Sequence, residues 1–262
     1  MRYNIGVVNF LNAYPLFFGF DKLYKNIRVI KDVPSRLSLL LRQNKLDAAL
    51  ISSIEYYRNK ENYDFHKGLC ISSKGKVESI RLFLSKDNDI VLTDNTINKP
   101  IDTLFFDYAS RSSVEMIKIL LKKHFPETNL KTIERNPPYE NIIENLKTNE
   151  SLILIGDLAL NNRNKKSIDL GLWYHKTFNK PFVYALWVFH KSSKIDTEIF
   201  ENVFRYSKEN WQKMIHEASL LFNFPAGFSK KYFENLIFYE MTPENLGGLS
   251  FFFQEYDKLI SF

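Results

Sequence analysis

The sequence predicts an α/β fold with two lobes, in which two doubly wound sheets are joined by two crossing strands. Short apolar runs alternate with segments of helical spacing over residues 3–59 and again over 103–155. This alternation is typical of parallel sheets covered by helices. Two long runs of strand character, 76–84 and 182–190, lie outside the alternating segments and are the expected connections between the lobes.

The expected domains are discontinuous along the chain. One lobe comprises 1–85 plus 191–262, and the other comprises 86–190, with strand 182–190 returning to the first lobe. Residues 195–262 contain no strand-like run and are predicted to be helical. Two-lobed folds of this kind close on a ligand in a cleft, so we expect the functional residues at the ends of the strands.

The composition favours a folded protein with a large core. The chain has 262 residues, of which 45% are hydrophobic, and it contains 23 Phe and 14 Tyr. Its net charge is +6, but no run of Lys and Arg is longer than two residues, and the aromatic residues lie in apolar runs. A stacking platform for nucleic acid is therefore not expected, whereas the charge suits an acidic small molecule.

The N-terminus and the cysteine content indicate the compartment. Asn4, Asn9 and Asn12 interrupt the first apolar segment, which therefore does not resemble a signal peptide. No uncharged apolar run approaches the ~20 residues that a membrane helix needs. Cys70 is the single cysteine, so no internal disulfide or cysteine-based metal cluster is possible. We expect a cytoplasmic protein that does not bind membranes.

The predicted elements of the first segment follow from apolar runs and from proline, which is tolerated in the first turn of a helix. They are strand 3–10, a helix opening at 12–16, strand 27–30, a helix begun by Pro34 and reaching 43, and strand 47–51.

The second segment is predicted in the same way, with residues 87–101 as a polar surface connection before it. Its elements are strand 103–107, helix 112–124, a strand near 130–133, helix 139–147 and strand 151–155. Aromatic residues at helical spacing in 232–239 and 249–256 are expected in the core.

Small polar residues follow several of the predicted strands. In doubly wound sheets, ligands bind outside the carboxyl ends of the strands. Unpaired N–H groups and the helix dipole at such turns attract a carboxylate or a phosphate. The candidate ligand-binding residues are Asn12, Ser52, Ser53, Ser110, Arg111, Ser112, Ser113, Gly156 and Asp157.

Each of these turns also has a purely structural interpretation, which the sequence leaves open. Ser52 to Glu55 and Ser112 to Glu115 fit the capping box, in which a serine and a glutamate satisfy the first turn of a helix. Asp157 fits a helix N-cap, and Asn12 fits an ordinary turn. In strand 76–84, alternation would place Ser79 on one face and Glu78 on the other.

Eight separated strings then resemble a known family in order and spacing: FLNAYPL, VPSRLSLLL, LDAALISSIEY, GKVESI, SRSSV, LIGDLAL, DLGLW and PFVYALWV. The chain is similar to the chorismate dehydratase family of menaquinone biosynthesis by the futalosine route. The similarity extends from about residue 5 to about residue 190. It implies a periplasmic-binding-protein-like (type II) fold without secretion and the removal of water from chorismate to give 3-[(1-carboxyvinyl)oxy]benzoate.

The resemblance also suggests roles for individual residues. Asn12 and Ser79 match positions that the family uses at the reacting ring, and Ser110–Ser113 match its anion-binding turn. Ser112 stands where many relatives carry threonine, which keeps the hydroxyl. Asp157 matches a motif residue to which no role is assigned. Because chorismate has two carboxylates, Ser52 and Ser53 are our candidates for binding the second one.

No general base is evident in these strings, so we expect the enolpyruvyl carboxylate of chorismate to take the ring proton. No phosphate loop, ligand set for a metal or dinucleotide fingerprint is present in the sequence, which predicts activity without metal or other cofactor. The alternatives are a cytoplasmic small-anion-binding or sensor protein of the same fold and the naphthoate-forming enzyme of the same pathway. The sequence does not predict the oligomeric state.

Overall fold

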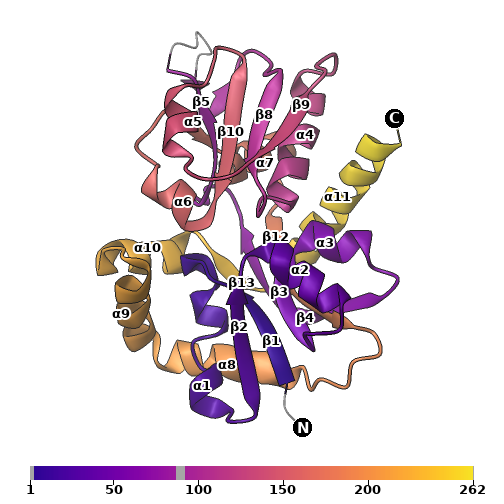
Figure 1. The fold of residues 1–262 in the computed structure, drawn as a ribbon, viewed down its shortest axis with the longest axis vertical. Coiled ribbons are helices and arrows are strands. Elements are labelled where there is room, and N and C mark those ends of the chain that lie inside the picture. The colour runs from indigo at the N-terminus through magenta and orange to yellow at the C-terminus, as the bar shows by residue number, and fades with distance from the viewer. Residues whose placement is uncertain (1–2, 87–91, 262) are drawn as a thin grey trace. The chain divides into compact units, whose positions relative to one another are not determined.

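The computed structural model describes residues 3–86 and 92–261, which divide into two compact units (Figure 1). Unit 1 contains the residues up to Ser72 together with Val183–Leu246. Unit 2 contains Ser73–Phe182 and the residues from Gly247 onward. The chain therefore passes between the units three times.

A six-stranded sheet forms the centre of unit 1, in the order β13-β4-β12-β3-β1-β2. β1 pairs in parallel with β2 and with β3, whereas β12 is antiparallel to β3 and β13 is antiparallel to β4. The strands are β1 (Tyr3–Val8), β2 (Ile27–Asp32), β3 (Ala48–Ser52), β4 (Tyr63–Ser73), β12 (Phe182–His190) and β13 (Phe238–Glu240).

The helices of unit 1 pack on this sheet and on one another. α2 packs against β1 and β3, α8 and α9 pack against η1, and α10 packs against α9. Their bounds are η1 (Leu11–Leu16, a 3₁₀-helix), α1 (Phe20–Leu23), α2 (Pro34–Arg42), α3 (Ser53–Arg58), α8 (Glu198–Glu209), α9 (Trp211–Phe222) and α10 (Ala226–Asn235).

A five-stranded sheet forms the centre of unit 2, in the order β11-β5-β10-β8-β9. β8 is parallel to β9 and β10, and β5 runs antiparallel to β10 and β11. The strands are β5 (Ile80–Leu84), β8 (Thr103–Asp107), β9 (Lys131–Arg135), β10 (Glu150–Ile155) and β11 (Ser167–Asp169), and β6 (Leu92–Thr93) with β7 (Thr96–Ile97) forms a separate hairpin.

The remaining helices belong to unit 2, except that α11 begins in unit 1 and continues into unit 2. They are α4 (Ser112–His124), α5 (Glu140–Glu144), α6 (Gly156–Asn161), α7 (Leu170–Phe178) and α11 (Pro243–Ile260). Of the described helices, none is both long and apolar enough to cross a membrane.

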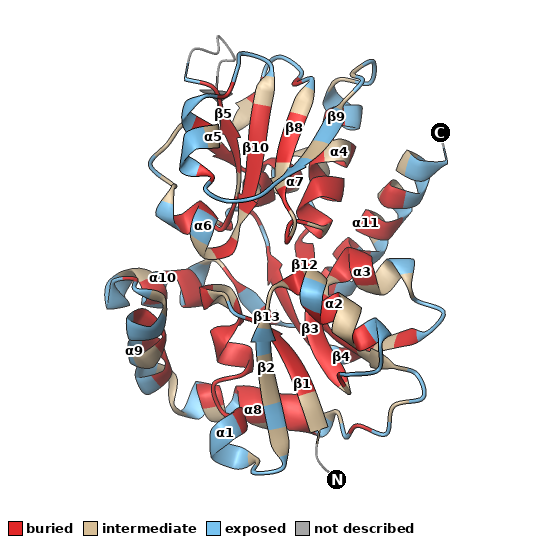
Figure 2. Cartoon of the chain, in the orientation of Figure 1, coloured by how far each residue is buried: buried red, intermediate tan, exposed pale blue. Residues whose placement is uncertain are grey.

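The central strands of both sheets are buried, as Figure 2 shows in red. In unit 1, the ring of Trp187 stacks on Phe200 with 4.5 Å between centroids, and Phe20 meets both rings edge-on. Aromatic pairs with these geometries stabilise a core beyond their buried area. The predicted apolar runs therefore form two cores, one for each sheet.

The predicted domain bounds differ from the observed units in two places. Residues 73–85 belong to unit 2, because β5 pairs there with β10 and β11. Residues 247–262 also belong to unit 2, because Phe252 packs on Phe182 with 4.6 Å between ring centroids. Only the first residues of the C-terminal helix, up to Leu246, therefore belong to unit 1, and the rest of this helix belongs to unit 2.

The observed strands differ from the sequence-based expectations in three places. The region 63–73, for which no element was predicted, forms the eleven-residue strand β4, in which Lys67 and Gly68 interrupt the apolar pattern. The short strand β13 lies at 238–240, where only helices were expected. The expected surface connection at 87–101 contains the hairpin β6–β7, and its first part, 87–91, lies outside the described residues.

Candidate functional site

Four of the predicted site residues carry a buried side-chain oxygen with no hydrogen-bond partner. These oxygens are Asn12 Oδ1, Ser52 Oγ, Ser79 Oγ and Ser110 Oγ. A buried polar atom without a partner costs about 1–3 kcal/mol, so most such atoms in proteins are paired. A ligand that bonds to these oxygens would recover that free energy.

Asn12 and Ser52 lie at the same edge of the unit 1 sheet and are named here the unit 1 cluster. Asn12 follows β1, and Ser52 is the last residue of β3. Because β1 and β3 are parallel neighbours, their carboxyl ends share one edge of the sheet. Asn12 is the second residue of the 3₁₀-helix η1, which begins three residues after β1 ends.

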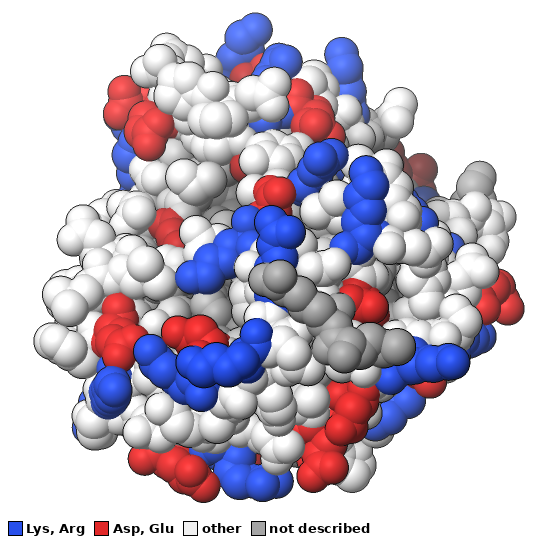
Figure 3. Space-filling view, turned by 60° about the horizontal axis from the view of Figure 1, so that its bottom comes forward, with Lys and Arg blue, Asp and Glu red and all other residues white. Residues whose placement is uncertain are grey.

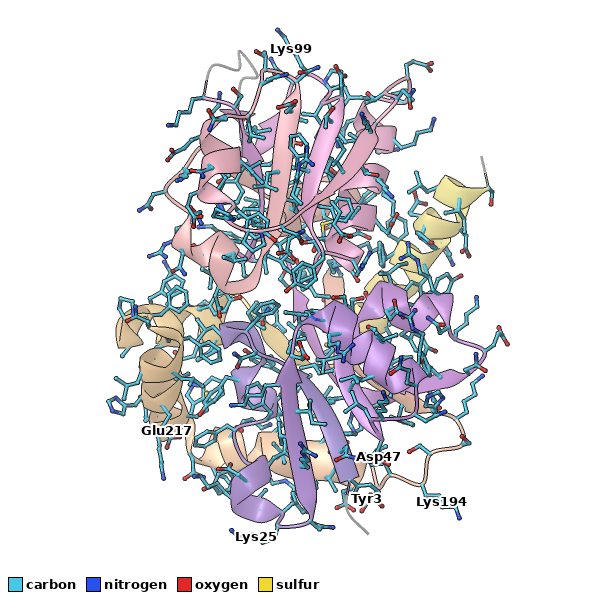
Figure 4. The ribbon with its side chains drawn as sticks, viewed as in Figure 1. Tyr3, Lys25, Asp47, Lys99, Lys194 and Glu217 are labelled. Carbon is cyan, nitrogen blue, oxygen red and sulfur yellow. The ribbon has the colours of Figure 1, made fainter. Side chains whose placement is uncertain are left out.

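Contacts from β13 and from α9 hold η1 in place. Tyr239 donates its hydroxyl proton to the backbone oxygen of Asn12 at 3.0 Å. Tyr14 donates to Glu217 of α9, labelled in Figure 4, at 3.5 Å. Burial and then the nearby Glu217 raise the pKa of Tyr14 to about 12, so its hydroxyl stays protonated as a donor. The backbone of Asn12 is thus fixed while its side-chain oxygen stays unpaired.

Ser52 and Ser53 are adjacent but have different surroundings. Ser53 is fully buried and donates its hydroxyl proton to the backbone oxygen of Val183 at 2.7 Å. Ser52 is the N-cap residue of α3, yet its side chain makes no capping bond. Glu55, the other member of the predicted capping box, instead accepts from Arg42 at 3.0 Å. The capping-box interpretation of Ser52 was therefore wrong, and Ser53 has a structural hydrogen bond.

Ser79, Ser110 and Gly156 meet at one edge of the unit 2 sheet and are named here the unit 2 cluster. Ser110 follows β8 and Gly156 follows β10, and these two strands are parallel. Ser79 precedes β5, which runs antiparallel to β10, so it lies at the same edge. A hydrogen bond of 2.8 Å from Gly156 N to Ser79 O joins the two segments directly.

The turn that carries Ser110 is held by a buried carboxylate. Asp107, which ends β8, accepts from the backbone N–H of Ala109 and from the hydroxyl of Tyr139, both at 2.5 Å. Its backbone oxygen also accepts from Ser110 N at 2.9 Å. Burial and then Asp107 raise the pKa of Tyr139, which keeps that hydroxyl a donor. No motif in the sequence marks Asp107 or Tyr139 as a supporting residue of the site.

Helix α4 begins directly after this turn. Ser112 is its first residue, Ser112 and Ser113 are buried, and Arg111 is the half-buried N-cap residue. The predicted capping box placed the N-cap at Ser112, one residue too late, because the N-cap residue is Arg111. Glu115, the other member of the predicted box, forms an ion pair with Lys118, with 3.3 Å between Oε1 and Nζ. The first N–H groups of a thirteen-residue helix and the Arg111 guanidinium can together attract an anion.

A strained turn carries Ser79. Ser79 N donates to the backbone oxygen of Val77 at 2.7 Å, across Glu78, whose φ is +60°. Three-residue turns with positive φ at the central residue are rare, and a residue so held costs of order 1–3 kcal/mol. The prediction that 76–79 continues the strand was therefore wrong, and so was the alternation of Glu78 and Ser79. Strain of this kind occurs often at ligand sites.

Gly156 and Asp157 begin α6, a helix whose N-cap residue is Ile155. The prediction that Asp157 is the N-cap was wrong, because the helix starts one residue before it. Gly156 has φ +59°, a conformation that residues with a Cβ rarely adopt. This conformation allows the N–H of Gly156 to donate to Ser79 O, and this hydrogen bond connects the two segments of the unit 2 cluster.

The histidines lie outside both clusters. His190 Nε2 contacts Leu41 O at 2.9 Å, His124 Nε2 contacts Thr177 at 2.9 Å, and His175 and His66 have other partners. Within residues 3–86 and 92–261, no three or more His, Cys, Asp or Glu side chains form a group that could hold a metal ion.

On the face of the molecule shown in Figure 3, acidic and basic side chains lie interspersed.

Comparison with known proteins identifies the family and the fold. A family model described as menaquinone biosynthesis matches residues 3–258. Protein AF1704 from Archaeoglobus fulgidus superposes with a TM-score of 0.73 at 11% identity, covering 100% of this chain and 98% of that one. The Candida albicans CA3427 gene product, described as having the generic periplasmic binding protein fold, gives 0.69 at 12% identity, covering 100% and 91%.

The alkanesulfonate-binding protein SsuA from Xanthomonas axonopodis pv. citri, bound to MOPS, also gives a TM-score of 0.69, at 9% identity and covering 99% and 92%. At such identities the structures show a shared fold only. The predicted periplasmic-binding-protein-like fold is confirmed, and the expected family is confirmed by the match over nearly the whole chain. The chain belongs to the menaquinone biosynthesis family.

Proposed function

We propose that this protein is a chorismate dehydratase that converts chorismate to 3-[(1-carboxyvinyl)oxy]benzoate and water. The observation that supports the proposal most is the set of four unpaired buried oxygens, on Asn12, Ser52, Ser79 and Ser110. All four are residues for which the family resemblance or the strand-end pattern predicts contact with the substrate. An organic anion rich in oxygen atoms would satisfy such groups.

Chorismate is a dicarboxylate, and the residues that we propose to bind it carry groups that hydrogen-bond to carboxylates. In the proposal, Arg111 and the N-terminus of α4 bind one carboxylate by charge-assisted hydrogen bonds. Ser52 contributes a hydroxyl toward the other, because the hydroxyl of Ser53 is already bonded to Val183 O. Asn12 and Ser79 then contact the ring and its departing hydroxyl. In the proposal, Gly156 and Asp157 also contact the substrate, from the same edge of the unit 2 sheet as Ser79.

The proposed reaction needs little acid–base chemistry from the protein. The enolpyruvyl carboxylate takes the proton of one ring carbon and passes it to the hydroxyl on the adjacent carbon. The C–O bond breaks, the hydroxyl leaves as water, and the electron pair of the broken C–H bond forms the double bond that completes the aromatic ring. Neither an amide nor a serine hydroxyl is a competent base near neutral pH. Catalysis then depends mainly on holding the substrate in a reactive conformation.

The direct test is to incubate purified protein with chorismate and to identify the product by mass spectrometry and ultraviolet absorbance. We expect conversion without added metal, nucleotide or other cofactor, and strongly reduced conversion by a folded Asn12→Ala, Ser79→Ala double variant. If folded wild-type protein leaves chorismate unchanged on prolonged incubation, the proposal is wrong.

A second candidate function is suggested by the fold neighbours. SsuA is an alkanesulfonate-binding protein, and a cytoplasmic anion-binding or sensor protein of the same fold would also bury polar groups toward a ligand. Tight binding of chorismate without turnover would favour that function. The naphthoate-forming enzyme of the same pathway is distinguished by the product. We propose a cytoplasmic location for the dehydratase.

A further inference from the structure

Asp169 is a buried carboxylate that the proposed reaction does not use. Only 1% of its surface is exposed, and it is the N-cap residue of α7, where Oδ1 accepts from Leu172 N at 3.0 Å. The same carboxylate accepts from two backbone N–H groups of the strained turn, from Val77 at 3.1 Å and from Glu78 at 2.6 Å. One side chain thus joins the start of α7 to the turn that carries Ser79.

The charge of Asp169 faces an identifiable set of groups. Arg81 is its register partner on β5, and its Nε donates to Ser167 Oγ at 2.9 Å. Burial raises the pKa of Asp169, while the backbone donors of Leu172, Glu78 and Val77, followed by the Arg81 charge, oppose this shift. A buried carboxylate costs free energy unless donors surround it, and here two of those donors belong to the turn.

The hairpin β6–β7 fixes the backbone of Asp169 in turn. Asn95 donates from Nδ2 to Asp169 O at 2.7 Å and accepts from Asp169 N at 2.9 Å. Its neighbour Asp94 is held by Lys176 of α7, with 2.5 Å between Nζ and Oδ1. The hairpin, Asp169 and the turn therefore form a continuous set of hydrogen bonds that ends beside the unpaired hydroxyl of Ser79.

We propose that Asp169 is a positioning residue for Ser79, and that Asn95 supports it by fixing its backbone. The carboxylate holds the turn in its strained conformation so that the Ser79 hydroxyl is placed for the reacting ring. The activity measurements below rest on the proposed dehydratase function, whereas the exchange measurement does not.

The first test is a double-mutant cycle of Asp169→Asn with Ser79→Ala. Asparagine keeps the shape but turns an NH₂ group toward backbone donors, which releases the turn. In wild-type background, kcat for chorismate should fall about 10²-fold, as for a misplacement of about 1 Å, with little change in KM. In Ser79→Ala background, Asp169→Asn should cost little more, because the hydroxyl it positions is gone. Equal losses in both backgrounds overturn the proposal.

The second test measures amide hydrogen exchange of Val77 and Glu78 without substrate. Exchange at both amides should be faster in Asp169→Asn than in wild type. Asp102→Asn is the matched control, because Asp102 is an exposed carboxylate of the same unit that bonds to Asn149 Nδ2 at 2.8 Å. The control should change neither exchange nor kcat.

Asn95→Ala covers the case in which Asp169→Asn does not fold, since it keeps the carboxylate and removes only its support. It should also accelerate exchange at Val77 and Glu78 and lower kcat, with the loss of kcat absent from Ser79→Ala background. Unchanged exchange in the folded variants overturns the proposal. If wild-type protein does not convert chorismate, the proposed function fails, but the exchange rates still decide whether Asp169 holds the turn.

Discussion

At the scale of single residues, adjacent serines can have opposite roles. Ser52 Oγ is buried without a partner, whereas Ser53 Oγ donates to Val183 O at 2.7 Å. The first arrangement costs stability in the ligand-free protein, and the second contributes to it. Binding sites commonly give up stability in this way, because groups meant for a ligand stay unpaired until it arrives.

This difference predicts opposite effects of one substitution. Ser52→Ala should raise the free energy of unfolding of the ligand-free protein by up to about 1 kcal/mol, because a buried unpaired hydroxyl is removed. Ser53→Ala should lower it by about 1–3 kcal/mol, because Val183 O loses its donor. Chemical denaturation of both variants without ligand is the measurement. Equal losses would mean that Ser52 Oγ already has a partner in solution.

At the scale of elements, the edge of the unit 2 sheet depends on backbone conformations that few residues adopt. Glu78 and Gly156 both have positive φ, and the bond from Gly156 N to Ser79 O connects their turns. The short helix α6 can begin directly after β10 because Gly156 permits this sharp change of direction.

Substitution of Gly156 tests this requirement. Gly156→Ala should lower the free energy of unfolding by about 1–2 kcal/mol, since a Cβ disfavours the left-handed conformation. The matched control is Gly227→Ala in α10, where an added Cβ would meet no atom within 4 Å. The control should raise stability by about 0.5–1 kcal/mol, because alanine favours helices more than glycine does. Similar losses in both variants would argue against a special conformation at Gly156.

At the scale of the whole molecule, the fold brings titratable groups of distant segments together. His66 of β4 is 6% exposed and lies 3.3 Å from Glu201 of α8, between Nε2 and Oε1. Its Nδ1 accepts from Gly68 N at 3.1 Å, so the neutral ring with a proton on Nε2 satisfies both partners. Burial lowers the pKa of His66, and the Glu201 carboxylate opposes that shift.

The lowered pKa predicts how stability depends on pH. Below the ordinary value near 6.5, the unfolded chain takes up a proton that the folded ring resists. The stability that His66 contributes is therefore present above about pH 6.5 and is lost as the pH falls through the folded pKa. The denaturation midpoint of the wild type should fall more between pH 7.5 and 5.5 than that of His66→Gln, whose side chain is polar but does not titrate. Parallel pH profiles would contradict this assignment.

The sequence by itself determined the local elements and the residue types of the clusters. Strand 103–107 and helix 112–124 have the predicted bounds, because apolar periodicity and the polar stretch between them are local signals. Asn12, Ser52, Ser79 and Ser110 were identified because they stand near strand ends or in strings shared with the family.

Only the tertiary structure decided which of these polar groups stay unpaired and what holds them. Ser52 and Ser53 are equivalent in the sequence pattern, and the difference between them comes from Val183, which is distant along the chain. Asp169 reaches Val77 and Glu78 across 92 and 91 positions and holds them out of the strand that alternation predicted. A local sequence pattern indicates which conformation a segment prefers by itself. Hydrogen bonds to residues distant along the chain can hold the same segment in a different conformation.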